Sequence, residues 1–212
     1  MDHYQETFNT WNKMADLYEE KFMDLPIYNE SYDRFCESIA MNGRILEIGC
    51  GPGNIARYLL DKSPTFQLKG LDVAENMIQL ARKNNPSAEF DVMDIRQLDQ
   101  LKETFDGIIC GFCIPYVSKD ECAKLFSDCA SMLSENGILY LSFVEGSEEQ
   151  SGFKTNHSGD GVYFYFHELE TIKEQLDSNQ FSLKHLIHVD YPKPEGPADV
   201  HTIVIAQKQS KG

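Results

Sequence analysis

A glycine-rich turn between two apolar segments is the part of this sequence best suited to chemistry. Residues 44–48 predict a buried strand and residues 55–60 the apolar face of a helix. Three glycines stand between them: Gly49, Gly51 and Gly53. Glycine permits unusual backbone angles and close approach of a ligand. Asp72 follows the next apolar run, 66–71, and its carboxylate can accept hydrogen bonds from two ribose hydroxyls. The pattern predicts a site for a nucleotide-type cofactor.

Two details argue against a dinucleotide. Asn54 occupies the sixth position of the turn, where a dinucleotide site has a third glycine that packs the helix on the strand. Glu47 stands two residues before the first glycine, where a buried carboxylate is costly unless paired and would repel a pyrophosphate. A ligand with a cationic amine fits better, so an NAD-dependent oxidoreductase is the disfavoured alternative.

Four segments in order resemble the motifs of class I S-adenosylmethionine-dependent methyltransferases of the small-molecule or ubiquinone-biosynthesis-like type. ILEIGCGPG (45–53) is similar to the first motif and GLDVAENMIQLAR (70–82) to the second. Asp94 and Ile95 resemble the third, and FDGIICGFCIPYV (105–117) the fourth. The resemblance covers most of the chain. It implies a cofactor, S-adenosyl-L-methionine, and methyl transfer to the nitrogen or oxygen of a small molecule. A non-catalytic S-adenosylmethionine-binding module is a further alternative.

The resemblance also implies which residues hold the cofactor. Glu47 and the glycine turn would hold the methionine half, Asp72 the ribose, and Asp94 with Ile95 the adenine. Tyr18 would reach the methionine end, because in this family the segment before the first motif folds over the cofactor. The full set of expected contacts is Tyr18, Glu47, Gly49, Cys50, Gly51, Gly53, Asp72, Val73, Met77, Asp94, Ile95, Cys110 and Gly111.

Composition limits the class of protein and its partners. A length of 212 residues suits a single α/β domain. A net charge of −15 without a basic stripe argues against nucleic acid, as does the lack of the NPPY or DPPY signature of nucleobase enzymes. The sequence shows neither a long apolar run nor a signal-peptide pattern, so we expect no membrane association and a cytoplasmic location. The oligomeric state stays open.

The six cysteines are expected to be reduced thiols. They lie within predicted strands, helices and the cofactor turn and do not space out a loop-rich disulfide framework. The pair Cys110-x-x-Cys113 raises the possibility of zinc, but it begins inside a predicted strand, whereas a zinc knuckle needs a tight turn. We therefore expect no metal.

Apolar periodicity predicts the elements that position these residues. Aromatic residues spaced by three and four predict a helix over 3–23 and a second over 28–39, which form an N-terminal helical cap, 1–42. Strands then alternate with helices through the cofactor-binding core, 43–144. The predicted strands are 44–49, 66–72, 88–93, 105–111, 137–144, 181–189 and 200–206, and the helices are 54–62, 74–84, 97–101, 119–133 and 167–178. This order predicts an α/β, Rossmann-like fold with a seven-stranded, mostly parallel sheet, an antiparallel last strand and helices on both faces.

The remaining segments are expected to build the acceptor site. Residues 145–166 form a candidate lid, mobile without ligands, whose aromatic end either lines a pocket or adds a strand; residues 167–212 form a helix and a strand hairpin. Methyl transfer needs a base only if the nucleophile must lose a proton before attack. Candidates for that or for orienting the acceptor are Tyr116, His157, Tyr165 and His201, none of them in a motif. A histidine pair after the fourth strand, common in small-molecule methyltransferases, is replaced by Pro115 and Tyr116.

Overall fold

A seven-stranded sheet forms the centre of the computed structural model, which describes residues 3–155, 159–193 and 198–210. The strand order is β3-β2-β1-β4-β5-β9-β8, in which β1 to β5 pair in parallel and β9 pairs antiparallel with both β5 and β8. The strands are β1 (Arg44–Ile48), β2 (Gln67–Asp72), β3 (Glu89–Val92), β4 (Phe105–Gly111), β5 (Leu133–Val144), β8 (Phe181–Tyr191) and β9 (Asp199–Lys208). The predicted fold class is confirmed.

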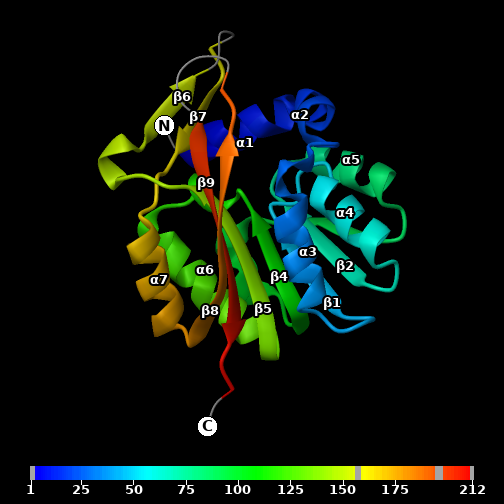
Figure 1. Ribbon diagram of the computed structural model, residues 1–212. Coiled ribbons are helices and arrows are strands. Elements are labelled where there is room, and N and C mark those ends of the chain that lie inside the picture. The colour runs from blue at the N-terminus through cyan, green and yellow to red at the C-terminus, as the bar shows by residue number, and fades with distance from the viewer. Residues whose placement is uncertain (1–2, 156–158, 194–197, 211–212) are drawn as a thin grey trace.

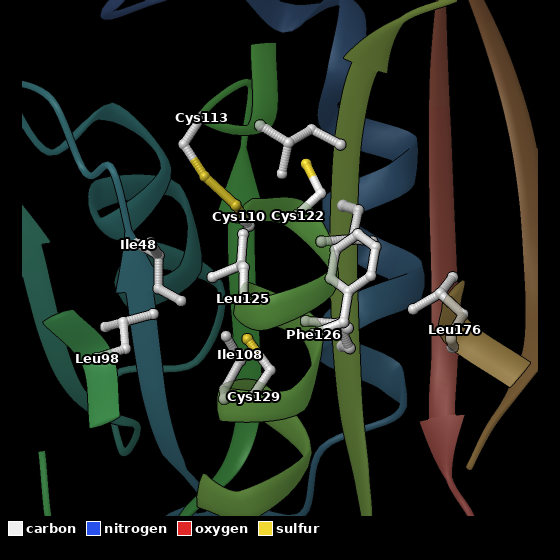
Figure 2. Packing of buried hydrophobic residues seen from close by; sticks show 14 of the residues in the cluster. Ile48, Leu98, Ile108, Cys110, Cys113, Cys122, Leu125, Phe126, Cys129 and Leu176 are labelled. Atoms are coloured by element: carbon white, nitrogen blue, oxygen red, sulfur yellow. A yellow bond between two sulfur atoms is a disulfide. The ribbon is translucent and has the colours of Figure 1, made fainter. Parts of the chain in front are cut away.

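Helices cover both faces of this sheet (Figure 1). One face carries α3 (Asn29–Glu37), α4 (Asn54–Lys62) and α5 (Glu75–Asn84), and the other carries α6 (Lys119–Met132) and α7 (Leu169–Ser178). On α6, a capping box of Ser118 and Glu121 fixes the first turn, and a buried stripe then faces the sheet (Figure 2). Short 3-10 turns complete the chain: η1 (Pro26–Tyr28), η2 (Ile95–Gln100), η3 (Ile114–Tyr116) and η4 (Glu148–Gln150).

The N-terminal helix is bent, which the sequence did not predict. It divides at Met14 into α1 (His3–Lys13) and α2 (Ala15–Phe22). The Asn12 carbonyl accepts a hydrogen bond from the Asn76 side chain at 2.8 Å, and the Asn12 side chain accepts one from the Asn76 backbone N–H at 2.9 Å. Because this tie to α5 engages a carbonyl of the helix itself, it favours the bend. The two pieces lie across the carboxyl ends of the strands (Figure 1).

The segment predicted as a lid contains a second, two-stranded sheet. The strands β6 (Gly152–Thr155) and β7 (Gly161–Phe164) pair antiparallel, and β7 lies beside α1 (Figure 1). Thr10 Oγ1 donates to the Gly161 carbonyl at 2.8 Å, and the Tyr163 N–H donates to Thr7 Oγ1 at 2.9 Å. The described parts of this segment are thus attached to the N-terminal cap. Its mobility and its closure over ligands stay predictions.

The expectation of six reduced cysteines is wrong for one pair. Cys110 and Cys113 form a disulfide, whereas Cys36, Cys50, Cys122 and Cys129 are buried free thiols, as predicted. The sequence pattern misled because β4 ends at Gly111 and Phe112 adopts a φ of +56°, which turns the chain back and leaves the two Cα atoms 5.8 Å apart.

Within the described residues, no helix is long and apolar enough to cross a membrane.

Candidate functional site

The turn between β1 and α4 lies where the strand order reverses. From β1 the chain adds β2 and β3 on one side and then returns to place β4 on the other, and ligands of open α/β sheets bind at such a point. Gly49 and Gly51 have φ values of +67° and +52°, a region that residues with a Cβ rarely adopt. A Cβ on Gly49 would lie 2.6 Å from that of Cys113, so glycine also lets the turn pack on the loop after β4.

Two adjoining cavities open above this turn. The first is lined by residues of all four motifs together with α1. The second extends beneath the N-terminal helices to the β6–β7 hairpin and the start of β9, and has a volume of about 450 Å³. This size suits a small molecule, since ligand pockets typically measure roughly 300–1,000 Å³. The residues lining both cavities are Trp11, Tyr18, Gly49, Gly51, Gly111, Phe112 and Tyr116.

Most of the predicted cofactor residues meet in these cavities. The first contains the predicted Tyr18, Gly49, Gly51, Asp72, Val73, Met77, Asp94, Ile95 and Gly111, and the second adds Glu47. The linings do not include Cys50, Gly53 or Cys110. Cys50 is buried beneath the turn, with its N–H bonded to the Leu71 carbonyl at 2.9 Å, and Gly53 packs on Ala81 and Asn85 at the start of α4. Cys50 and Gly53 therefore support the glycine turn without lining either cavity.

Asp72 is placed to accept hydrogen bonds from a ligand. Its Oδ2 accepts from the Gly51 N–H at 2.9 Å and its Oδ1 from the Ala74 N–H at 2.8 Å, which fixes the carboxylate at the end of β2. Each carboxylate oxygen can accept a second bond, so the side chain still has capacity for a diol. Burial raises the pKa of Asp72 above its ordinary value, against the opposing effect of the backbone N–H groups.

Glu47 is a buried carboxyl whose two oxygens find no hydrogen-bond partner among the described residues. Glu47 is only 1% exposed and lines the second cavity. Burial raises the pKa of Glu47 well above its ordinary value of 4.5. An unpartnered buried carboxyl normally carries a large penalty, which a cationic group bound in the cavity would relieve.

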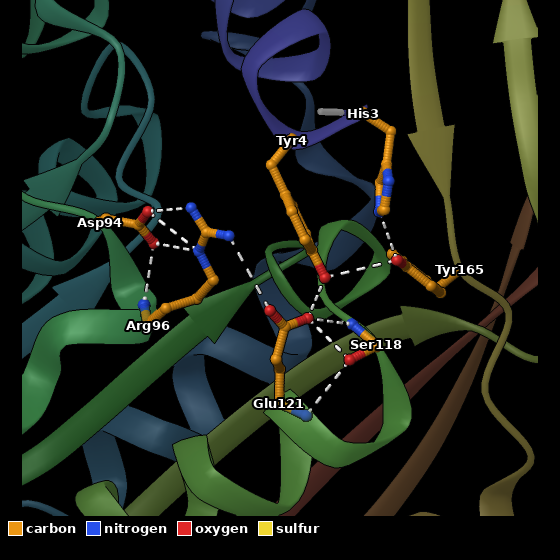
Figure 3. Close-up of polar contacts among 7 residues, drawn as sticks. All are labelled: His3, Tyr4, Asp94, Arg96, Ser118, Glu121 and Tyr165. Carbon is orange, nitrogen blue, oxygen red and sulfur yellow. Dashed lines mark hydrogen bonds and ion pairs between the residues drawn. The ribbon is translucent and has the colours of Figure 1, made fainter. Parts of the chain in front are cut away.

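Asp94 begins a polar network that ties the first cavity to the N-terminal helix (Figure 3). It caps η2 by accepting from the Arg96 N–H at 2.9 Å, and both of its oxygens accept from Arg96 Nε at 3.0 Å. The Arg96 guanidinium lies 4.2 Å from the centre of the Tyr4 ring and also faces Glu121, which accepts from the Tyr4 hydroxyl. Tyr165 extends the network to His3, at 2.7 Å.

Aromatic rings line both cavities and form about half of the wall of the second. Trp11 meets Tyr18 edge-on at 5.6 Å and Tyr116 at 5.5 Å, and Tyr116 meets Phe164 at 6.0 Å. The indole Nε1 of Trp11 is buried without a hydrogen-bond partner among the described residues. Further rings come from distant elements: Phe22, Tyr28, Tyr32, Phe112, Phe166, Tyr191 and His201. Residues 162–166 were predicted either to line a pocket or to add a strand. Each prediction holds in part, because β7 is a strand and Phe164 and Phe166 line the second cavity.

His201 lies in this aromatic wall at the start of β9. Its Nδ1 forms a hydrogen bond with the Tyr28 hydroxyl at 2.7 Å, and its ring stacks on Tyr191 at 4.8 Å with an interplanar angle of 12°. Burial lowers the pKa of His201 below its ordinary value of 6.5, so the imidazole is neutral at pH 7. The His201 ring is therefore both neutral and held in one orientation.

The other candidate bases fare differently. Tyr116 lines both cavities. Tyr165 lies outside both linings: its chain neighbours Phe164 and Phe166 line the second cavity, whereas Tyr165 bonds to His3 and Tyr4. His157 lies outside the described residues. The expected contact of Tyr165 with an acceptor is therefore not supported.

Several site residues escaped sequence reasoning. Arg96 and Trp11 support or line the cavities, yet neither belongs to one of the four motifs; Phe112 lies in the fourth motif but was given no role. Trp11 was assigned only to an apolar helix face, and the single available signal was its place in the segment expected to fold over the cofactor. Lys21 and Lys154 at the second cavity were also missed, because α2 and β6 meet only in the folded chain.

The chain is similar to known methyltransferases in sequence over its core. Residues 45–137 match a family model described as a methyltransferase domain. A malonyl-[acyl-carrier protein] O-methyltransferase from Bacillus cereus is 31% identical over 142 residues, 65% of this chain and 51% of that protein. Trans-aconitate 2-methyltransferase from Variovorax paradoxus is 29% identical over 106 residues, 50% of this chain and 40% of that protein. The chain thus spans about half or less of the length of these curated relatives.

The whole fold has a counterpart among solved structures. Magnesium protoporphyrin IX methyltransferase from Synechocystis PCC 6803, solved with bound S-adenosylmethionine, superposes with a TM-score of 0.72 at 16% identity, covering 99% of this chain and 98% of that chain. At this identity the likeness concerns the fold alone. These comparisons lend no support to the oxidoreductase alternative. Residues 45–137 are thus similar to a methyltransferase domain, and the chain has the Rossmann-like fold of class I methyltransferases.

Proposed function

We propose that this protein transfers a methyl group from S-adenosyl-L-methionine to a small-molecule acceptor. The observation that carries the proposal is Glu47, a buried carboxyl without a partner among the described residues, at the glycine turn that borders both cavities. A carboxyl in that position favours a ligand with a cationic amine, which S-adenosylmethionine has and a dinucleotide pyrophosphate lacks.

Residues of both cavities fit this cofactor. Glu47, which lines the second cavity, would hold its amino group, and in the first cavity Asp72 would hold its ribose hydroxyls and Asp94 with Ile95 its adenine. The unpartnered Trp11 N–H is a further donor within the shared wall. When bound, the cofactor supplies a methyl group attached to a positively charged sulfur. The protein holds the acceptor in line with that methyl group and excludes water, which together contribute up to about 7–11 kcal/mol to such reactions.

The acceptor we propose is a flat molecule with a negatively charged group. The rings of Phe112, Phe164 and Tyr191 offer planar apolar surfaces suited to stacking. Lys21 and Lys154 line the same cavity from α2 and β6, and neither forms an ion pair within the described part of the chain. Lys21 and Lys154 lie over the rings of Phe22 and Phe166, at 4.9 and 5.4 Å from the ring centres. Two lysines without an ion pair beside one cavity favour an anionic acceptor.

His201 is the proposed general base for an acceptor that must lose a proton. With its proton on Nδ1 donated to the Tyr28 oxygen, the imidazole presents Nε2 as an acceptor. Burial raises the pKa of Tyr28, so its hydroxyl stays protonated and keeps the ring in place. An acceptor that is an amine near its own pKa would not need this step, so dependence on His201 separates oxygen from nitrogen acceptors.

Labelled-methyl transfer into a fractionated metabolite extract, followed by mass analysis, tests the proposal. We expect one or a few labelled products that are planar acids, and saturable binding of S-adenosylhomocysteine by calorimetry. Replacing both cavity lysines, K21A/K154A, should raise the apparent KM for the acceptor and leave cofactor affinity unchanged, whereas the exposed control K184A should change neither. Absence of cofactor binding would refute the proposal.

The alternatives are separated by the same measurements. A non-catalytic binding module would bind S-adenosylhomocysteine but label nothing in the extract. An NAD-dependent oxidoreductase would instead enhance nicotinamide fluorescence in a titration. The position of Glu47 disfavours the second, because a pyrophosphate at the start of α4 would lie near its carboxyl.

A further inference from the structure

The Cys110–Cys113 disulfide connects the end of β4 to the loop that closes both cavities (Figure 2). Cys110 is the penultimate residue of β4 and is fully buried, whereas Cys113 is 6% exposed and lines the first cavity. Cys113 also packs on the first glycine of the cofactor turn, since a Cβ on Gly49 would lie 2.6 Å from its own Cβ. The bond therefore fixes the wall of the first cavity.

The residues enclosed by this bond include a strained one. Phe112 has a φ of +56°, which is unfavourable for a bulky side chain and persists only where surrounding contacts hold it. Its ring lies 4.7 Å from that of His201 and 5.2 Å from that of Tyr28. Phe112 lines both cavities. The disulfide thus restrains Phe112, which contacts the proposed base His201 and also lines the first cavity.

Cys113 lines the first cavity and packs on Gly49, whereas Cys110 is fully buried in the core. A molecule bound in the first cavity would cover Cys113, because Cys113 shares the lining with Asp72 and Asp94. A ligand in the first cavity would therefore limit access to the disulfide.

We propose that Cys110 and Cys113 form a reversible redox site whose oxidation state is coupled to binding in the first cavity. The disulfide form holds Phe112 and the cavity wall in the arrangement that binds the cofactor. Reduction releases both, so that the cofactor binds more weakly, and by linkage a bound cofactor favours the disulfide to the same degree. The inference adds regulation to the proposed function but concerns binding alone.

The reaction partner is a dithiol. A thiolate of the dithiol attacks Sγ of Cys113 through the first cavity, the Cys110–Cys113 bond breaks, and Cys110 leaves as a thiolate that takes up a proton. The second thiol of the reductant then attacks the mixed disulfide and releases Cys113 as a thiol. Two electrons pass to the protein, and the dithiol becomes a disulfide. The reverse exchange, with a small disulfide as oxidant, restores the bond.

Alkylation with mass analysis and calorimetry test this proposal, with S-adenosylhomocysteine as the probe. In the oxidised protein we expect alkylation after denaturation at four cysteines, and after dithiothreitol at six. Reduction should weaken S-adenosylhomocysteine binding at least about fivefold, the low end of coupling between sites. S-adenosylhomocysteine at 100 times its Kd leaves about 1% of sites open, so it should slow reduction at least about tenfold.

Two variants serve as comparison. C110S/C113S should bind S-adenosylhomocysteine like the reduced wild type and respond to no reductant, while C129A, which lacks a buried thiol of α6 far from both cavities, should keep the full redox dependence. If C110S/C113S fails to fold, the reduced wild type, with its fold checked by circular dichroism, carries the test. Equal affinity in both oxidation states, or equal reduction rates with and without S-adenosylhomocysteine, would overturn the proposal. Loss of all cofactor binding in the oxidised protein would instead refute the proposed function.

Discussion

Replacing Glu47 by Gln should stabilise the ligand-free protein and weaken cofactor binding. The residue is 1% exposed, with no hydrogen-bond partner for either oxygen among the described residues, and burial raises its pKa well above 4.5. The unfolded chain releases this proton near its ordinary pKa, whereas the folded chain retains it to a higher pH. Stability is therefore lost as pH rises above about 4.5, until the carboxyl ionises in the folded state.

The magnitude follows from the distance between pH 7 and the unfolded pKa. Keeping Glu47 protonated at pH 7 costs at most about 3.4 kcal/mol, at about 1.36 kcal/mol per pH unit above 4.5. Glu47→Gln removes this cost while leaving a neutral polar group, so the free energy of unfolding at pH 7 should rise by roughly 1–3 kcal/mol. At pH 4, where both states are protonated, the gain should disappear.

Binding should change in the opposite direction. A charge-assisted hydrogen bond to an amine contributes roughly 1.5–3 kcal/mol, so S-adenosylhomocysteine should bind about ten- to a hundredfold more weakly to the variant. Urea unfolding at pH 4, 7 and 8 and calorimetry measure the two effects. The exposed Glu135→Gln serves as control and should change neither. A variant that is less stable than wild type at pH 7, or that binds S-adenosylhomocysteine with wild-type affinity, would refute the reasoning.

Further predictions concern the cavities directly. Asp72→Ala should weaken S-adenosylhomocysteine binding about ten- to a hundredfold in calorimetry, because a carboxylate fixed by two backbone N–H groups is lost; unchanged affinity in a folded variant would contradict the assignment. Gly51→Val should abolish binding before it prevents folding, since φ is +52° and the side chain would enter the cavity, and circular dichroism separates the two effects. His201→Asn should lower kcat/KM for an oxygen acceptor about 10²- to 10⁴-fold. In the wild type we expect activity to fall as pH drops and His201 protonates, with a midpoint below pH 6.5; the His201 variant should lose this pH dependence and the exposed His188→Asn should keep it. Amides of 150–155 and 161–165 should exchange more slowly with cofactor and acceptor both present, and no change would contradict a lid.

The sequence by itself determined the sheet and the cofactor side of the site. Alternation of strands and helices follows from local apolar periodicity, and the predicted cofactor contacts lie at the ends of parallel strands, where chain order determines their position. Gly49, Gly51, Asp72 and Asp94 meet at one cavity for this reason, and their local backbone demands are visible as residue types.

Only the tertiary structure decided the second cavity, which is the proposed acceptor side, and the oxidation state of Cys110 and Cys113. The second cavity joins α2, the β6–β7 hairpin and β9, whose mutual approach depends on packing between segments far apart in the chain and leaves no periodic signal. The pairing of His201 with Tyr28 joins residues 173 positions apart. The disulfide depends on one positive φ at Phe112. Phenylalanine rarely adopts this conformation, so the sequence does not predict it; tertiary contacts hold the residue there.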